Sequence, residues 1–367
     1  MFTRLLVMKL PKGQSAFLWG ARQTGKSTYL AKYFPKSMFI DFLQSNILLE
    51  FIKQPSLLRE RILSLPKASL KYPIILDEIQ KVPVLLNEVH WLIENTAAQF
   101  ILCGSSARKL RRNGANLLGG RAWRYHFYPL VSAEIPKFNL LHAFNSGLVP
   151  SHYLSTQPEK SLQAYVEDYL TQEIKEEGLV RSLPSFALFL DSMGFSNGEL
   201  IKYTNIARDC GVDSKTVQNY FQILVDTLLG YYVLPFKKKI GRDIITQTPK
   251  FYLFDVGVAN YLSKKSIQIL KGHEAGKSFE HFIFMELVAY NGLNKKRLAF
   301  SYWRTKTGLE VDFNSHNHAS NNPYLEVTYS TVSGPANMKT WNGLAKASIK
   351  TMGGLAIASV KTWDGLS

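Results

Sequence analysis

Gly20-Ala21-Arg22-Gln23-Thr24-Gly25-Lys26-Ser27-Thr28 decides the fold, because it fits the phosphate-binding pattern G-x4-G-K-S without a mismatch. An apolar run, residues 16–19, precedes it, and a helix-like segment, Lys26–Tyr33, follows. The order strand, loop and helix lets backbone N–H groups and a positive helix end face a phosphate. The stretch therefore predicts a nucleoside triphosphate site, in which phosphate is bound by Gly20, Gln23, Thr24, Gly25, Lys26, Ser27 and Thr28. In such a loop the lysine reaches the β- and γ-phosphates, and the Ser27 hydroxyl binds Mg²⁺.

Two acidic residues end the next apolar run, residues 72–78. A buried parallel strand delivers such residues to a site at its carboxyl edge. We therefore expect Asp77 to hold Mg²⁺ through water and Glu78 to polarise an attacking water, which favours an ATPase over a kinase. A strand that merely ends in surface acids is the alternative.

Residues 99–106 predict another buried strand, which ends in Ser105 and Ser106 and lies between the other two strands. Ser105 can sense the γ-phosphate and orient water, or both serines can cap the following helix. Arg121 follows a Gly-Gly pair. It can stabilise γ-phosphate charge in its own subunit or in a neighbour, or it is a surface arginine.

These blocks resemble a prokaryotic family of AAA-type ATPases whose core is followed by a C-terminal domain of unknown function. The likeness rests on the phosphate loop, I-L-D-E-I-Q-K-V-P (74–83), C-G-S-S (103–106) and G-G-R with P-L-V-S-A-E-I (119–135). It implies an α/β P-loop NTPase core with a parallel sheet over residues 1–136, using ATP and Mg²⁺. It also implies a helical lid, a winged helix and a small α/β restriction-endonuclease-like domain.

Composition narrows the class of protein. The chain has 367 residues, which predicts two to four modules, and 46% hydrophobic with 20% charged residues is typical of a globular protein. The first ten residues do not resemble a secretory signal, and no apolar run approaches the ~20 residues that cross a bilayer. Cys103 and Cys210 are expected to be core residues, so we expect a cytoplasmic location and no membrane partner.

The formal net charge of +16 indicates a nucleic-acid partner or simply a solvated basic surface. Residues 137–196 are predicted to start with a loop, 137–160, and to continue as a helix over 162–177. Residues 197–262 have the spacing of a winged helix-turn-helix. Its candidate DNA contacts are Lys215, Gln218 and Asn219 on the second helix, and Lys237, Lys238 and Lys239 at the tip of the wing.

Residues 263–367 predict a long helix and three strands, in the layout of restriction-endonuclease-like nucleases. Glu286, Asp312 and Glu326 form a candidate second metal site. Thr328 stands where that pattern has a lysine, with Lys306 as a candidate substitute, so we expect a degenerate and inactive nuclease domain.

Two functions remain in competition. One is an Mg²⁺-dependent ATPase that couples nucleotide state to a C-terminal DNA-binding or nuclease-like module. The other is an ATP-dependent signalling or assembly switch, with or without oligomerisation, whose C-terminal domains bind protein.

Overall fold

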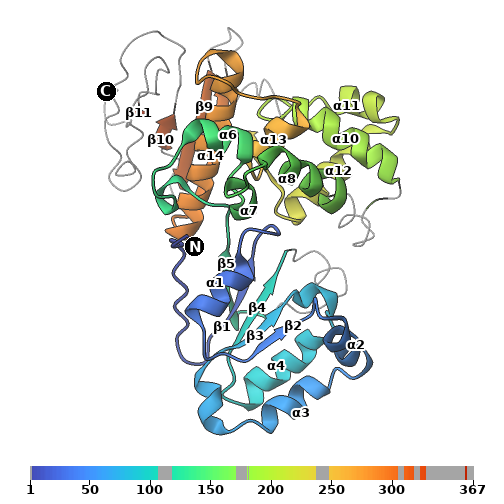
Figure 1. The fold of residues 1–367 in the computed structure, drawn as a ribbon, viewed down its shortest axis with the longest axis vertical. Helices are drawn as coiled ribbons and strands as arrows, with labels where there is room; N and C mark the ends of the chain where they lie inside the picture. The colour runs from blue at the N-terminus through green and yellow to red at the C-terminus, as the bar shows by residue number, and fades with distance from the viewer. Residues whose placement is uncertain are drawn as a thin grey trace, which may run out of the picture. The chain divides into compact units, whose positions relative to one another are not determined.

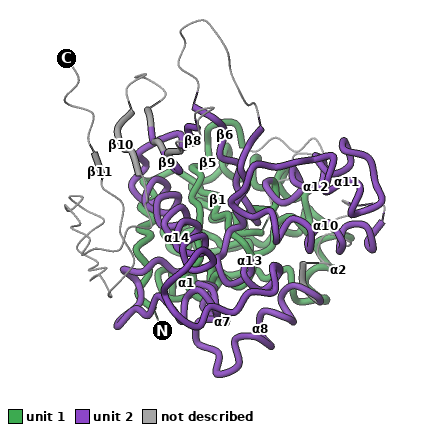
Figure 2. Tube along the Cα trace, turned by 90° about the horizontal axis from the view of Figure 1, so that it is seen from above, with its two compact units in different colours: residues 1–129, 226–228 green, residues 130–225, 229–367 purple. Residues whose placement is uncertain are grey.

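The computed structural model describes residues 2–105, 118–170, 180, 182–236, 248–304, 310–317, 323–327 and 360–361. The chain divides into two compact units (Figure 2). Unit 1 comprises residues 1–129 and 226–228, and unit 2 comprises residues 130–225 and 229–367. In the described part of the chain, no helix combines the length and the apolar character needed to span a membrane.

Unit 1 is built on a five-stranded parallel sheet with the strand order β2-β3-β4-β1-β5 (Figure 1). The predicted position of β4, between β3 and β1, is confirmed. The strands are β1 (Ser15–Trp19), β2 (Phe39–Asp41), β3 (Ile74–Asp77), β4 (Phe100–Gly104) and β5 (Ala122–His126). The helices are α1 (Lys26–Tyr33), α2 (Ser45–Lys53), α3 (Leu57–Leu63) and α4 (Leu85–Asn95), with short 3₁₀ turns η1 (Lys67–Lys71) and η2 (Ile79–Lys81).

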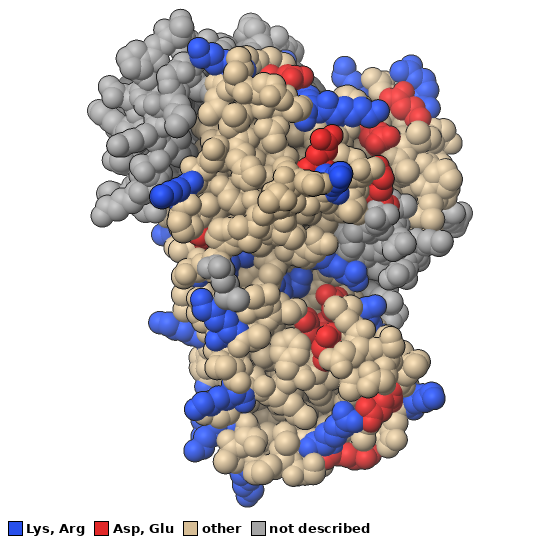
Figure 3. All heavy atoms as spheres, viewed as in Figure 1, with Lys and Arg blue, Asp and Glu red and all other residues tan. Residues whose placement is uncertain are grey.

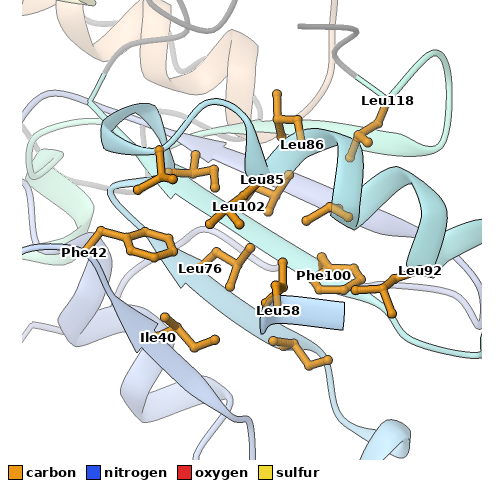
Figure 4. Close-up of a cluster of buried hydrophobic side chains, with 14 of the residues drawn as sticks. Ile40, Phe42, Leu58, Leu76, Leu85, Leu86, Leu92, Phe100, Leu102 and Leu118 are labelled. Carbon is orange, nitrogen blue, oxygen red and sulfur yellow. The ribbon is translucent and has the colours of Figure 1, made fainter. Parts of the chain in front are cut away.

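The central strands are buried on both faces, as a parallel sheet between helices requires. Successive side chains of a strand point to opposite faces. Phe100 and Leu102 of β4 join the cluster that α2, α3 and α4 cover (Figure 4), whereas Ile101 is buried outside that cluster. On α1, Tyr29 and Leu30 are buried, and the Tyr29 hydroxyl donates to the Leu6 carbonyl of the N-terminal segment at 3.0 Å.

The helices of unit 2 correct one prediction. Residues 137–160, expected to be a loop, contain helices α6 (Leu140–Ser146), α7 (Pro150–Tyr153) and the start of α8 (Pro158–Ala164). Prolines and serines suggested a loop, but Pro150 and Pro158 each occupy the first turn of a helix. Proline fits there because N–H groups in the first turn have no intrahelical partner. The chain continues as a π-helical segment, η4 (Tyr165–Leu170); residues 171–179 of the expected helix lie outside the described residues.

The segment predicted as a helix-turn-helix contains two helices, α11 (Tyr203–Cys210) and α12 (Ser214–Asp226), which follow α10 (Leu183–Phe195). Gly211 ends α11 with a φ of 65°, a backbone conformation that glycine adopts without strain. On α12, Val217, Phe221 and Leu224 are buried, and their spacing of four and three residues places them on one face of the helix. Phe221 packs edge-on against Phe189 of α10 at 4.9 Å between ring centroids.

A six-stranded sheet with the order β11-β10-β9-β8-β6-β7 completes unit 2. Strands β6 (Gly230–Pro235) and β7 (Lys250–Leu253) pair antiparallel, as the predicted wing requires. However, β6 also pairs in parallel with β8 (Leu298–Arg304). The wing strands therefore belong to the same sheet as β9 (Glu310–Asn317), β10 (Pro323–Val327) and β11 (Val360–Lys361).

Helix α14 (Gly272–Leu293) packs on this sheet through aromatic side chains. Phe284 stacks on Phe313 of β9 at 5.2 Å between ring centroids, and it packs against Tyr252 of β7 at 4.6 Å with the two rings tilted. The shorter helix α13 (Val256–Leu262) begins at Asp255, whose carboxylate accepts the Val258 N–H at 3.0 Å and thus caps the helix.

Candidate nucleotide site

The phosphate loop, residues 20–28, joins β1 to α1, which is the order of strand, loop and helix that the sequence predicts. Gly25 precedes α1 with a φ of 92°, and Gln23 has a φ of 60°. Thr24 is buried, and its hydroxyl donates to the Ala21 carbonyl at 2.8 Å, which closes the loop on itself. The curl directs the free N–H groups of the first turn of α1 towards one place, as an anion site needs.

Lys26 is the buried cation of this loop, with 5% of its surface exposed. Its Nζ donates to the carbonyl oxygens of Gly20 at 2.8 Å and Ala21 at 2.9 Å. The two residues after it, Ser27 and Thr28, are exposed at the start of α1. Among the described residues, the hydrogen-bond acceptors of the Lys26 ammonium are these two neutral carbonyls. A bound phosphate would supply the negative charge that compensates this desolvated cation.

The shape of the phosphate loop is restricted by close packing at Gly20 and by contacts of Arg4. A methyl group at Gly20 would collide with the Phe127 carbonyl, so only glycine fits there. Arg4 donates to the Thr24 carbonyl at 2.8 Å, and its guanidinium lies 4.2 Å from the centroid of the Phe127 ring. The N-terminal segment therefore contributes to the shape of the phosphate loop, which no motif in the sequence indicated.

Asp77 ends β3 beside the phosphate loop, as predicted. The Ser27 hydroxyl donates to Asp77 Oδ2 at 2.6 Å, and the Glu78 N–H donates to Asp77 Oδ1 at 3.1 Å. Asp77 and Glu78 are both buried. The structure thus brings Ser27, Asp77 and Glu78 to the carboxyl edge of the sheet.

This donor set fits Mg²⁺, which prefers hydroxyl and carboxylate oxygens. Ser27 Oγ and Asp77 Oδ2 are adjacent, and the desolvated carboxylate accepts hydrogen bonds from the Ser27 hydroxyl, the Glu78 N–H and the Cys103 thiol. When bound, the ion would offset the charge of the phosphates. Ser27 and Asp77 are the residues that would hold it.

Ser105 follows β4 and is buried near Glu78. Its Oγ accepts a hydrogen bond from Gln80 Nε2 at 3.1 Å, and the same amide donates to Glu78 Oε2. The structure therefore links Glu78 and Ser105 through a residue that the sequence did not single out. Ser106 lies outside the described residues.

Arg121 is not brought to this site. It precedes β5, its carbonyl accepts the Ser15 N–H at 3.2 Å, and its guanidinium forms an exposed ion pair with Glu94. Because β1 and β5 are parallel, Arg121 lies at the amino edge of the sheet, about 16 Å of strand from the phosphate loop. The prediction that Arg121 acts on the γ-phosphate in its own subunit therefore has no support from this geometry; a role in a neighbouring subunit stays a prediction.

The structure also differs from the predicted second metal site, which combined Glu286, Asp312 and Glu326. Glu286 accepts the Ser132 N–H at 2.8 Å and the Ser132 hydroxyl at 2.9 Å, so it does not meet Asp312. The carboxylate of α14 that shares a partner with Asp312 belongs to Glu280, six residues earlier. Six residues turn a helix by about 240°, which puts the two glutamates on different faces.

Lys250 of β7 lies between Glu280 and Asp312. Its Nζ is 3.5 Å from Glu280 Oε1 and 3.4 Å from Asp312 Oδ1, and its side chain is 6% exposed. Tyr252 donates its hydroxyl to Glu280 as well. Among the described residues, no three His, Cys, Asp or Glu side chains form a group that could hold a metal ion. The side chains of Glu326, Thr328 and Lys306 lie outside the described part.

Burial raises the pKa of Glu286 to about 7, against the lowering effect of the two Ser132 hydrogen bonds, and Glu134 raises it further. A carboxyl whose pKa is higher in the folded chain binds protons more tightly there. Its contribution to the free energy of unfolding therefore increases as the pH falls from about 7 to about 4.5.

We expect the Glu286→Gln variant to lose this component, on the order of 1–3 kcal/mol between pH 7.5 and pH 5 relative to wild type. Urea unfolding midpoints at several pH values measure it. Asp255, whose pKa burial raises to about 6, contributes in the same direction and remains in the variant. The matched control is Glu274→Gln on the exposed first turn of α14. Equal pH profiles for wild type and Glu286→Gln would contradict the assignment.

The candidate DNA contacts are only partly described. Lys215, Gln218 and Asn219 are exposed on α12, as predicted, whereas Lys237, Lys238 and Lys239 lie outside the described residues. On the face shown in Figure 3, lysine and arginine side chains are spread over each unit with acidic side chains among them. Cys103 and Cys210 are buried free thiols, and burial raises both of their pKa values, so neither resembles a reactive nucleophile.

Comparison with known protein families agrees with this geometry. Residues 12–135 match the model of an AAA domain, residues 139–268 match a domain of unknown function (DUF8612), and residues 275–358 match another (DUF4143). The chain therefore carries an AAA-type, ATP-binding domain followed by two domains of unknown function. The predicted resemblance is confirmed to that extent.

Its relatives include bacterial proteins. An uncharacterized protein of Mycobacterium tuberculosis is 23% identical over 246 residues, which are 65% of this chain and 55% of that protein. The chain thus spans about half the length of this relative. An uncharacterized Haemophilus influenzae protein is 25% identical over 305 residues, 73% of each chain. Among solved structures, the Aeropyrum pernix ORC1 protein in complex with DNA is 13% identical in sequence. The match covers 68% of this chain and 86% of the ORC1 chain. Its TM-score of 0.25 is too low for a functional comparison.

Proposed function

We propose that unit 1 hydrolyses ATP in the presence of Mg²⁺. The observation that carries this proposal is the convergence of Lys26, Ser27, Asp77 and Glu78 at one edge of the sheet, joined by the hydrogen bond from Ser27 to Asp77. A phosphate loop alone binds a nucleotide. The glutamate that follows the metal-binding aspartate supplies a general base, which hydrolysis needs and binding does not.

Each residue has a role that follows from its chemistry. Backbone N–H groups of residues 23–28 and the Lys26 ammonium bind the β- and γ-phosphates, and Ser27 and Asp77 hold the metal ion. Glu78 accepts a proton from the attacking water, and Ser105 orients that water or the γ-phosphate. Release of inorganic phosphate from ATP by the purified chain, abolished by a chelator of Mg²⁺, is the direct test. No release above the rate in buffer would refute the proposal.

A separate proposal concerns the purpose of ATP hydrolysis: the bound nucleotide, ATP or ADP, controls DNA binding by unit 2. Its support is the α11–α12 pair, whose second helix exposes Lys215, Gln218 and Asn219, together with the formal net charge of +16. The competing function is an assembly switch in which the same helices bind a protein. The spread of charge in Figure 3 is compatible with both.

A filter-binding titration at several salt concentrations separates these two functions. DNA binding predicts an affinity that falls steeply with salt, and a slope smaller by roughly 3 once Lys237, Lys238 and Lys239 are changed to glutamine. The matched control replaces the exposed Lys12, Lys67 and Lys71 of unit 1 and should leave the slope unchanged. Absence of binding at low salt, with and without ATP, would favour the assembly switch.

We further propose that the C-terminal domain does not cut DNA. Lys250 already balances Glu280 and Asp312, so a divalent ion at this pair would have to displace an ammonium. In addition, Thr328 carries no charge where the nuclease pattern has a lysine. The loss of one preorganised electrostatic group costs on the order of 10²- to 10³-fold in rate. Plasmid incubated with the protein and Mg²⁺ or Mn²⁺ should therefore stay supercoiled. Nicking that disappears in Asp312→Ala would overturn this view and identify Lys250 or Lys306 as a relocated catalytic group.

A further inference from the structure

Gln80 joins the ends of two strands at the nucleotide site. It lies in η2, directly after β3, and is 3% exposed. Its Nε2 donates one hydrogen bond to Glu78 Oε2 and another to Ser105 Oγ at 3.1 Å. Since an amide nitrogen has two protons, both of its donors are used on residues of the proposed hydrolytic machinery.

The amide oxygen of Gln80 is unsatisfied within the described part of the chain, in contrast to its amide nitrogen. Gln80 Oε1 is buried and has no hydrogen-bond partner among the described residues. A methyl group at Gly104 would collide with this oxygen and would approach the Trp19 ring to 2.9 Å. Glycine at the end of β4 therefore makes room for an amide whose oxygen is unsatisfied, at a cost of about 1–3 kcal/mol. A buried polar atom left without a partner indicates a functional constraint at this place.

The backbone of Glu78 is constrained at the same position. Glu78 has φ 56° and ψ 43°, a left-handed conformation that costs a residue with a side chain about 1–2 kcal/mol. The η2 turn holds it there, because the Lys81 N–H donates to the Glu78 carbonyl at 2.9 Å. Strain of this kind is concentrated at active sites. With its backbone set by the turn, the orientation of the Glu78 carboxylate depends on the side-chain contact with Gln80.

We propose that Gln80 is a positioning residue for ATP hydrolysis, which holds the Glu78 carboxylate through Oε2 and couples it to Ser105. The inference rests on the proposed function of unit 1. The amide engages Oε2, which leaves Oε1 to accept the proton of the water. In the reaction the water oxygen bonds to the γ-phosphorus and one water proton passes to Glu78. The bond from the γ-phosphorus to the β–γ bridging oxygen breaks, which leaves its electron pair on ADP and yields inorganic phosphate.

A positioning role makes a kinetic prediction that a purely structural role does not. Gln80→Leu removes both hydrogen bonds and keeps a side chain of similar size. We expect kcat to fall about 100-fold, the effect of a small misplacement of a reacting group. The KM for ATP and the Kd for ATP should stay within about twofold of wild type, because Gln80 has no described contact with the phosphate loop.

A double-mutant cycle with Glu78→Gln provides the second readout. If Gln80 acts through Glu78, the double variant should be no slower than Glu78→Gln alone. The matched control is Gln99→Leu at the opposite end of β4, where Gln99 Nε2 donates to the carbonyls of Pro11 and Gln14, and its kcat should not change. Gly104→Ala displaces the Gln80 amide without changing it, so it should also lower kcat.

The outcomes are distinguishable. Full activity of Gln80→Leu in a chain whose wild type hydrolyses ATP would overturn the positioning role and leave the proposed function intact. A parallel loss of ATP affinity, or additive losses in the double-mutant cycle, would show a structural role and would also overturn it. A wild-type protein without ATP hydrolysis would remove the proposed function and this inference together.

Discussion

Replacing Lys26 with alanine should abolish ATP binding, whereas Glu78→Gln should bind ATP normally and fail to hydrolyse it. Lys26 is a buried cation of the phosphate loop, and its loss removes the ammonium group that we propose binds the phosphates. We expect the affinity for ATP to fall at least ~100-fold, or about 2.7 kcal/mol. Glu78→Gln keeps the shape and removes the base, so kcat should fall about 10²- to 10⁴-fold at unchanged affinity.

Equilibrium binding of a fluorescent ATP analogue and release of phosphate measure the two effects separately. Lys32→Ala is the matched control, because Lys32 is exposed in the last turn of the same helix. If Glu78→Gln hydrolyses ATP as fast as wild type, the assigned base is wrong. If Lys26→Ala binds ATP with wild-type affinity, the nucleotide does not use this loop.

The second large effect is expected at Lys250→Met, which should destabilise unit 2 by about 3 kcal/mol. The substitution leaves Glu280 and Asp312, whose side chains are 15% and 17% exposed, without the ammonium between them. Removing one member of a desolvated ionic group is costly because the remaining charges stay buried. The Tyr252 hydroxyl bond to Glu280 offsets only part of this loss. Urea unfolding at pH 7.5 measures the change.

The matched control for this prediction is Lys277→Met on α14. Lys277 pairs with Glu199, and their side chains are 33% and 47% exposed, so the change should cost less than about 1 kcal/mol. Combining Lys250→Met with Glu280→Gln and Asp312→Asn should recover much of the lost stability, because no buried charge then remains unpaired. Equal stabilities for Lys250→Met and Lys277→Met would show that the ion pairs of Lys250 are energetically unimportant.

The AAA-type P-loop core could be predicted from sequence because its signals are local. The phosphate loop and the pair Asp77 and Glu78 each follow a short apolar run, and parallel strands bring such ends to one edge. Less distinct signals predict less accurately: helical periodicity runs through residues 47–65, yet Pro55 lies between α2 and α3 and separates them. Pro150 and Pro158, which begin helices, were read as breaks.

The rest depends on contacts between distant residues. Nothing in the sequence around Lys250 shows that it meets Glu280 and Asp312, 30 and 62 residues further on. Helical spacing alone did not distinguish Glu280 from Glu286, since both lie among apolar residues of α14. Gln80 stands next to a predicted catalytic residue, but a buried glutamine has no motif of its own, and only its bonds to Glu78 and Ser105 reveal it.

The pairing of β6 with β8 has a practical consequence for anyone who divides this protein. The sequence suggests a boundary between residues 262 and 263, yet Leu234 and Pro235 pair with Ser301 and Tyr302 across it. A fragment that stops at residue 262 would expose one edge of β6, which is a template for intermolecular strand pairing. Such a fragment should aggregate on expression, so the helix-turn-helix and the C-terminal sheet need to be produced as a single piece.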